Sequence, residues 1–140
     1  LLAFLITQIT YIYLFNILAK GTLFNLKSLV ISLLFLAYYF LFMNSIIAGL
    51  GDMSIPVFVY GFALCVMGVS AFRCVNSQMN YSVILFGAIL FIFSDSIIAF
   101  REFKSQWEMS LPIFHVLIMI LYIFGQFFIV NGVVKMSLAK

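Results

Sequence analysis

The sequence predicts an all-α membrane protein, a polytopic bundle of about five transmembrane helices. Hydrophobic residues make up 66% of its 140 residues and charged residues only 8%, so there are too few polar side chains to cover a surface in water. The mean hydropathy of +1.28 agrees with this composition. Apolar stretches of about 18 residues recur along the chain, and a soluble domain of this size has too little interior to hide them. We therefore expect lipid to surround the protein.

Helices, and not the strands of a barrel, are the predicted spanning elements. In lipid every backbone group must find its hydrogen bond within the protein, so a span is either a helix or part of a closed barrel. Barrel strands alternate between polar and apolar residues. Residues 33–36 and 118–121 are apolar on every side, which favours helices.

The first two predicted spans lie before the turn at residues 51–54. The first covers residues 1–19 and ends at Lys20. The second covers residues 28–50 and follows a short polar linker. At a rise of about 1.5 Å per residue, spans of this length cross a hydrocarbon core of about 30 Å with varying tilt.

Three further spans are predicted after that turn. The predicted ranges are residues 55–72, 82–100 and 111–134. Pro56 and Pro112 fall in the first turn of their segments, where the missing N–H of proline costs nothing. Because the linkers are short, we expect neighbours in sequence to pack antiparallel within a single transmembrane domain over residues 1–140.

The chain begins inside an apolar run. No charged n-region and no small-residue cleavage site precede this run. We therefore expect the domain to be N-terminally truncated, as a C-terminal fragment of a longer protein.

The distribution of basic residues predicts an orientation. Five passes place five basic residues on one side of the membrane: Lys20, Lys27, Arg73, Lys135 and Lys140. The other side carries Arg101 and Lys104. Basic residues concentrate on the cytoplasmic side of membrane proteins, so we expect a cytoplasmic C-terminus. No basic patch is interleaved with aromatic residues, and we expect no nucleic-acid partner.

Asp95 is the strongest candidate for chemistry. It lies 13 residues beyond the start of its predicted span, roughly 20 Å along a helix, and apolar residues surround its Ser94 and Ser96 neighbours. An ionisable group costs a few kcal/mol or more at such a depth, so it faces the bundle interior and serves a purpose. Catalysis is one interpretation, and a structural aspartate paired across helices is the other.

Ser94 and other polar residues in the spans are candidates for lining a pocket around Asp95. Spacings of seven and four place His115, Tyr122 and Gln126 on one face of the last span. Gln8 lies in the first span, Asn44 near the end of the second and Tyr60 in the third. His115 is also consistent with an interfacial histidine, and each tyrosine with ordinary packing or an aromatic belt.

The depth of these residues predicts where the pocket opens. Five of them fall within roughly 6 to 12 Å of one membrane face, counted from the nearer predicted boundary: Gln8, Asn44, Tyr60, Asp95 and His115. This face bears Asp52 and the charged stretch 101–108. We expect a polar pocket that opens toward this side.

The sequence contains no general catalytic signature. HExxH, GxSxG, a phosphate-binding loop and CxxC are all missing from it. One histidine and one buried aspartate are too few ligands for a metal, so we expect no metal and no cofactor. Cys65 lies inside a predicted span and Cys74 near its end, positions that suit packing and not a disulfide framework.

Four segments together resemble one known family. Residues 86–96, FGAILFIFSDS, resemble the GA-x-LF-x-x-SD-S segment of the YhhN-like lysoplasmalogenase family, and residues 122–130, YIFGQFFIV, are similar to its closing Y-x-x-x-Q-x-L-I-V segment. Residues 56–60, PVFVY, match its P-V-x-x-Y stretch, and residues 5–15 are similar to its A-H-x-x-Y-x-x-x-F helix. The segments follow the family's order. The resemblance implies eight spans in the full-length protein, of which this chain is the C-terminal portion.

Two departures from the family pattern bear on the site. This chain has Gln8 where the family usually has histidine in the first of these helices. The family's other acidic motif, a G-D pair in an earlier helix, would precede Leu1, so a second catalytic carboxylate is expected outside this chain. The Gly51-Asp52 pair comes after the helix of Tyr11 and does not take that role.

The resemblance implies a hydrolase that cleaves the vinyl ether bond of a lysoplasmalogen, a lysophospholipid of the bilayer, to a fatty aldehyde and a glycerophospho-base. It also implies an integral protein of the bacterial inner (plasma) membrane. Protonation of the vinyl ether requires an acid, and a carboxyl group in apolar surroundings favours its protonated form. We expect Asp95 to be this acid or a member of an acid pair, with Gln126, Tyr60 and His115 shaping the pocket.

Two other classes of function are compatible with the same residues. In a non-enzymatic lipid-binding or transport protein, Asp95 would accept protons or pair with a substrate amine. In a structural assembly subunit, Asp95 would support stability or oligomerisation without any turnover. Only the enzyme would release aldehyde from a lysoplasmalogen in the absence of a gradient.

Overall fold

The computed structural model describes residues 2–19, 26–75, 82–103 and 112–138, and this part of the chain is a helical bundle without strands. Five α-helices follow one another, with the 3₁₀ turns η1 (Ile47–Gly49) and η2 (Gly51–Met53) between the second and third. The helices are α1 (Leu2–Leu18), α2 (Leu26–Ile46), α3 (Ser54–Val75), α4 (Ser82–Phe103) and α5 (Pro112–Leu138). The prediction of an all-α bundle with five helices is confirmed.

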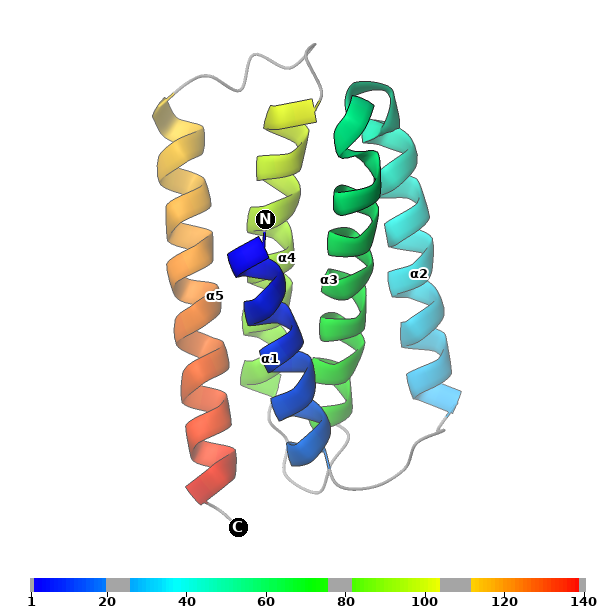
Figure 1. The fold of residues 1–140 in the computed structure, drawn as a ribbon. Coiled ribbons are helices and arrows are strands. Elements are labelled where there is room, and N and C mark those ends of the chain that lie inside the picture. The colour runs from blue at the N-terminus through cyan, green and yellow to red at the C-terminus, as the bar shows by residue number, and fades with distance from the viewer. Residues whose placement is uncertain (1, 20–25, 76–81, 104–111, 139–140) are drawn as a thin grey trace.

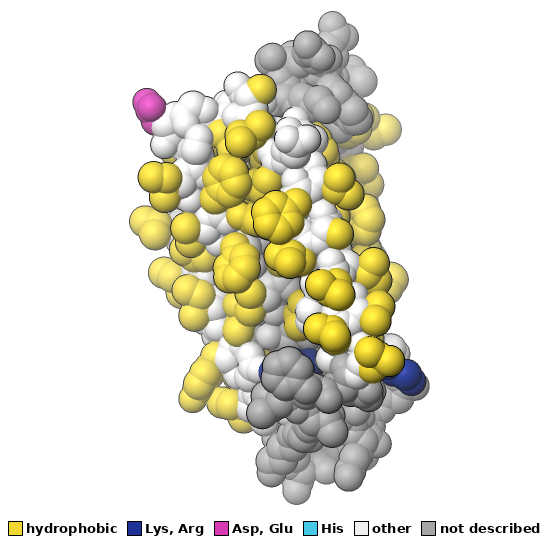
Figure 2. All heavy atoms as spheres, turned by 90° about the vertical axis from the view of Figure 1, so that its right-hand side faces the viewer, with side chains coloured by type: hydrophobic (Ala, Val, Ile, Leu, Met, Phe, Trp, Pro, Cys, Tyr) yellow, Lys and Arg dark blue, Asp and Glu magenta, His cyan; other side chains and the backbone are white. Residues whose placement is uncertain are grey.

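Four helical stretches are long and apolar enough to cross a membrane, by length and composition. They are Leu26–Gly49, Gly51–Val75, Ser82–Phe103 and Ile113–Leu138. The remaining helix, α1, is apolar but has 17 residues. Apolar side chains cover the face in Figure 2 between an acidic group at one end and basic groups near the other. The chain is an integral membrane protein.

The helices end at other residues than the predicted spans. The predicted spans stop at charged residues, which mark the membrane boundary, but a helix can continue beyond that boundary. Arg73 lies in the last turn of α3 and Lys135 in the last turn of α5. A basic side chain at a helix C-terminus stabilises it through the helix dipole, so both helices continue past their apolar stretches. At the other end of the bundle, α2 stops at Ile46, and Gly51, the first residue of η2, adopts a left-handed backbone with φ of 48°.

Four of the helices stand side by side in the order α5, α4, α3, α2, and α1 lies in front of them (Figure 1). Helix α1 packs mainly on α3 and also contacts α5, while α2 packs on α3 at the edge of the bundle. The N-terminus of α1 lies about midway along the bundle and not at its end (Figure 1). In this view α1 passes in front of the lower part of the α3–α4 pair (Figure 1).

Helices α4 and α5 approach each other closely at their glycines. A Cβ atom added to Gly87 would lie 2.8 Å from the carbonyl oxygen of Gly125 and from the amide nitrogen of Ile129. Lipid tails are as apolar as leucine, so helices in a membrane associate through such close packing of small residues and not through the hydrophobic effect. The side chains of Phe91 and Ile129, fully buried in the adjoining core, show how tightly this interface is filled.

Candidate active site

Asp95 is the centre of the candidate site. It lies in the second half of α4, and its side chain is only 6% exposed. Its Oδ2 atom accepts a hydrogen bond from the hydroxyl group of Tyr60 on α3. The adjacent Ser94 is fully buried and donates a hydrogen bond of 3.2 Å to the carbonyl oxygen of Ile118 on α5. The α4 backbone around Asp95 is therefore tied to both of its neighbouring helices.

A second group of polar side chains joins α1 to α5. The hydroxyl group of Tyr11 donates a hydrogen bond to Oε1 of Gln126. About two turns earlier on α1 and one turn earlier on α5, the rings of Phe4 and Tyr122 meet edge to face with centroids 5.9 Å apart. These two contacts hold α1 parallel to α5 in front of the α3–α4 pair (Figure 1).

Gln8 lies between those two contacts and is fully buried. Its carboxamide is near enough to the Tyr60 hydroxyl for an electrostatic interaction. Even so, among the described residues neither Nε2 nor Oε1 of Gln8 makes a hydrogen bond of normal geometry, and Nε2 of Gln126 is likewise buried without a partner there. A buried polar atom without a partner costs about 1 to 3 kcal/mol, so these three atoms stand out in the interior of the bundle.

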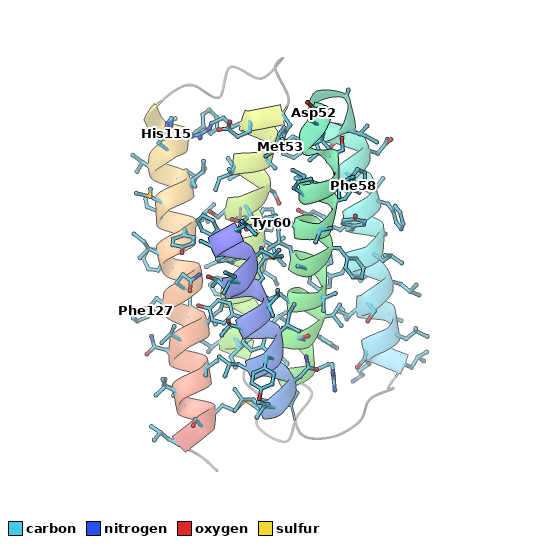
Figure 3. All side chains as sticks on the ribbon, viewed as in Figure 1. Asp52, Met53, Phe58, Tyr60, His115 and Phe127 are labelled. Atoms are coloured by element: carbon cyan, nitrogen blue, oxygen red, sulfur yellow. The ribbon has the colours of Figure 1, made fainter. Side chains whose placement is uncertain are left out.

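A pocket of about 370 Å³ connects Asp95 with one end of the bundle. Asp95 and Tyr60 lie at its inner part, and Glu102 and Met53 lie toward the end that also bears Asp52. Figure 3 shows this order, with Met53 and Asp52 at the end of the bundle and Tyr60 deeper, beside the start of α1. The Glu102 carboxylate is paired with Arg101 at 2.9 Å. The remaining wall is apolar: Phe4, Val57, Ile98, Ala99 and Phe103.

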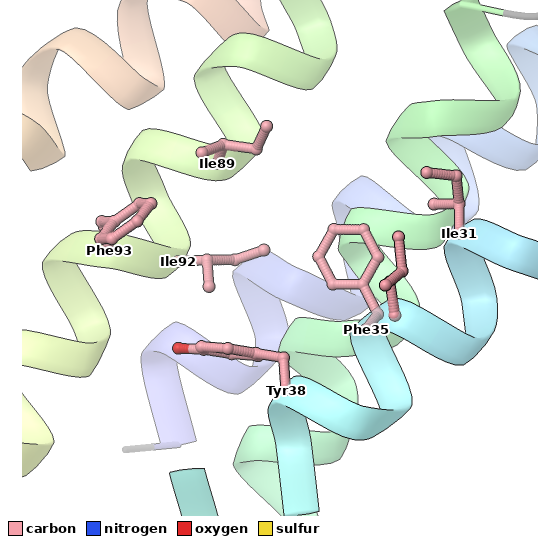
Figure 4. A pocket seen from close by; sticks show the side chains of 7 residues that line it. Ile31, Phe35, Tyr38, Ile89, Ile92 and Phe93 are labelled. Carbon is pink, nitrogen blue, oxygen red and sulfur yellow. The ribbon is translucent and has the colours of Figure 1, made fainter. Parts of the chain in front are cut away.

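A second hollow faces lipid between α2 and α4. This groove has a volume of about 270 Å³ and is walled by apolar side chains and by the ring of Tyr38 (Figure 4). The hydroxyl groups of Tyr38 and Ser96 form a hydrogen bond of 2.5 Å. Both residues also line a small cavity of about 30 Å³ that reaches Asp95. The Tyr38–Ser96 bond thus lies between the groove and the carboxylate.

Six of the predicted site residues come together, and two do not. The first group contains Gln8, Tyr60, Ser94, Asp95, Tyr122 and Gln126. Asn44 and His115 have exposed side chains, and His115 lies at the outer start of α5 in Figure 3. Gln8 shares the level of Tyr60 and Asp95, because its carboxamide lies near the Tyr60 hydroxyl.

Sequence reasoning missed Tyr38 and Glu102, which the structure places at the two sides of Asp95. Tyr38 stands in a helix that is apolar all round, so no periodic pattern tells which of its faces meets α4. The one sequence feature that marks this position is the pair of adjacent tyrosines, Tyr38 and Tyr39. Lys104 and Glu108 of the charged stretch lie outside the described residues.

The arrangement suits proton donation. Within residues 2–19, 26–75, 82–103 and 112–138, no group of three or more His, Cys, Asp or Glu side chains could hold a metal ion. A carboxyl group held away from water is a suitable general acid when a substrate atom can reach it. The pocket above Asp95 provides that access, and its apolar wall suits a lipid.

Comparison with known proteins gives one match. The model of the YhhN family matches residues 1–133. No curated protein and no solved structure matches the chain significantly.

Proposed function

The chain belongs to the YhhN family, and from this premise we propose that it hydrolyses the vinyl ether bond of lysoplasmalogens within the membrane. Membership of the family supports a lysoplasmalogenase-like function, and therefore a hydrolase. The vinyl ether bond and the lysophospholipid substrate are the specific parts of the proposal. One observation supports them above all: a buried carboxyl group lies at the inner part of a mostly apolar pocket that opens toward one end of the bundle.

In the proposed reaction Asp95 first acts as a general acid. Its carboxyl proton passes to the β-carbon of the vinyl ether, the C=C electron pair forms the new C–H bond, and an oxocarbenium ion results. The Asp95 carboxylate then lies beside this cation and stabilises it electrostatically in surroundings with little water. The Tyr60 hydroxyl, bonded to Oδ2, keeps the carboxyl group in one orientation.

Water completes the reaction. A water molecule attacks the cationic carbon and loses a proton to the Asp95 carboxylate, which restores the acid. The resulting hemiacetal collapses to a fatty aldehyde and the free hydroxyl group of the glycerophospho-base. Atoms balance with water as the only co-reactant, so no cofactor is required.

The remaining residues of the cluster shape the pocket in this proposal. Ser94 fixes α4 against α5, and Tyr122 and Gln126 form the α5 side of the cluster. Asn44 and His115 take no part, because their side chains are exposed outside the cluster.

The direct test compares Asp95→Asn with Asp52→Asn in the purified protein. Both variants replace one carboxylate by an amide, but Asp52 is exposed at the end of the bundle. We expect Asp95→Asn to abolish aldehyde release from a lysoplasmalogen in detergent or liposomes, and Asp52→Asn to retain it. Aldehyde release by folded Asp95→Asn at the wild-type rate would refute the role of Asp95. Uptake of lipid that depends on a gradient, without aldehyde, would favour a carrier.

We also propose that the C-terminus is cytoplasmic and that the membrane is the inner membrane of a bacterium. Lys27, Arg73 and Lys135 all lie at the end of the bundle opposite Asp52, and basic residues concentrate on the cytoplasmic side. The pocket would then open toward the outer side. Labelling of a cysteine introduced at Asp52 with an impermeant reagent in intact cells tests this orientation, and labelling only after lysis would contradict it.

A further inference from the structure

The fully buried Gln8 has no role in the reaction as described, although its carboxamide is the most conspicuous unpartnered group in the bundle. Its two polar atoms and Nε2 of Gln126 leave three open hydrogen-bonding positions. Two of these are donors and one is an acceptor. Buried water molecules in proteins make about three hydrogen bonds to groups of this kind.

The two glutamines face the same region. Phe4, Gln8 and Tyr11 are spaced by four and three residues and lie on one face of α1. The first and last of them contact Tyr122 and Gln126 of α5, so the residue between them faces this part of α5 as well. Gln8 also interacts with the Tyr60 hydroxyl, which is bonded to Asp95. The unpartnered atoms of Gln8 therefore lie one side chain away from the carboxyl group.

We propose that the carboxamides of Gln8 and Gln126 bind the water molecule that attacks the substrate. This inference rests on the proposed function. A lipid group is too large for the position, because Gln8 is fully buried and lies beyond the pocket that ends at Phe4, Tyr60 and Asp95. Water is the smallest species that can both donate to Oε1 and accept from Nε2.

An amide suits this task because it does not ionise near neutral pH. It holds the water by hydrogen bonds and leaves the Asp95 carboxylate as the base that takes the proton of the attacking water. Gln8 is thus a positioning residue and not a catalytic one. Its replacement should change which nucleophile captures the cation, and not how tightly lipid binds.

The test measures competition between water and methanol for the oxocarbenium ion. Capture by water gives aldehyde, whereas capture by methanol gives a stable methyl acetal. We expect Gln8→Leu to raise the ratio of acetal to aldehyde about tenfold, the effect of about one hydrogen bond. The matched amide-to-leucine control is Asn131→Leu, since among the described residues the Asn131 side chain bonds within its own helix, to the Phe127 carbonyl. It should give the wild-type ratio.

A saturated ether analogue binds like the substrate but cannot be protonated at carbon. Its dissociation constant shows whether Gln8 contacts the lipid or only positions water. The dissociation constant should be the same for wild type and Gln8→Leu. An unchanged acetal ratio in folded Gln8→Leu, or weaker analogue binding with that ratio unchanged, would overturn the water site. If Gln8→Leu does not fold, Gln126→Met tests the same site by the same ratio.

A structural readout keeps this inference distinct from the proposed function. If the wild-type protein releases no aldehyde, the proposed function fails, and the acetal ratio cannot be measured. An experimental map at high resolution then decides the water site alone. Density for a water within about 2.7 to 3.2 Å of the Gln8 carboxamide supports it, and protein atoms filling that position refute it.

Discussion

Replacing Gly87 by alanine tests whether the close approach of α4 and α5 holds the bundle together. The new Cβ atom would lie 2.8 Å from backbone atoms of Gly125 and Ile129, whereas ordinary contacts begin at 3.4 Å. The helices would have to separate by the difference of 3.4 and 2.8, about 0.6 Å. A gap of that size forfeits a quarter to a half of the dispersion energy of each affected contact. We expect the free energy of unfolding to fall by about 2 kcal/mol.

The matched control is Gly61→Ala on α3. A Cβ atom there would meet Met43 at 2.3 Å, but the atom it meets is Cε, the far end of a flexible side chain. Methionine adapts by rotation, so the cost should stay under about 1 kcal/mol. Both changes bring the same gain in helix propensity, and the difference between the variants isolates the backbone clash.

Reversible unfolding in mixed micelles of mild detergent and SDS, followed by circular dichroism, provides the measurement. The Gly87→Ala variant should unfold at a lower SDS fraction than Gly61→Ala. If the two variants unfold together, or if Gly87→Ala is the more stable, the argument from backbone contact is wrong.

Three further changes probe hydrogen bonds of the site. Tyr60→Phe keeps the ring but loses the hydrogen bond to Asp95. In steady-state assays kcat for aldehyde release should fall about tenfold, and an unchanged kcat would count against an orienting role of Tyr60. Tyr11→Phe leaves Oε1 of Gln126 without its donor, and SDS unfolding should show a loss of about 1 to 2 kcal/mol. Ser94→Ala removes the bond to α5 and should cost about 0.6 kcal/mol, the average for membrane helices; a loss above about 2 kcal/mol in the same assay would contradict that estimate.

The five helices and the importance of Asp95 follow from the sequence. Long apolar runs leave lipid as the only suitable solvent, and lipid demands that each run satisfy its own backbone as a helix. An aspartate deep in such a run stands out because its insertion is costly. The structure agrees on both points, with Asp95 buried and bonded to Tyr60.

Which helix faces meet was decided only by the tertiary structure. In water an amphipathic pattern marks the buried face of a helix, but in a membrane both the core and the surroundings are apolar, and the pattern is lost. The sequence pattern therefore does not distinguish Asn44, Tyr38 and His115. In the structure the Tyr38 hydroxyl forms a hydrogen bond with the Ser96 hydroxyl, whereas the side chains of Asn44 and His115 are exposed at the outside of the bundle. The chain by itself determined that a polar residue in a span is rare and costly. Only the packing of the helices determined that Tyr60 meets the acid, that Gln8 lies beside Tyr60 and that Gln126 meets Tyr11, because only packing selects which polar groups share one interior.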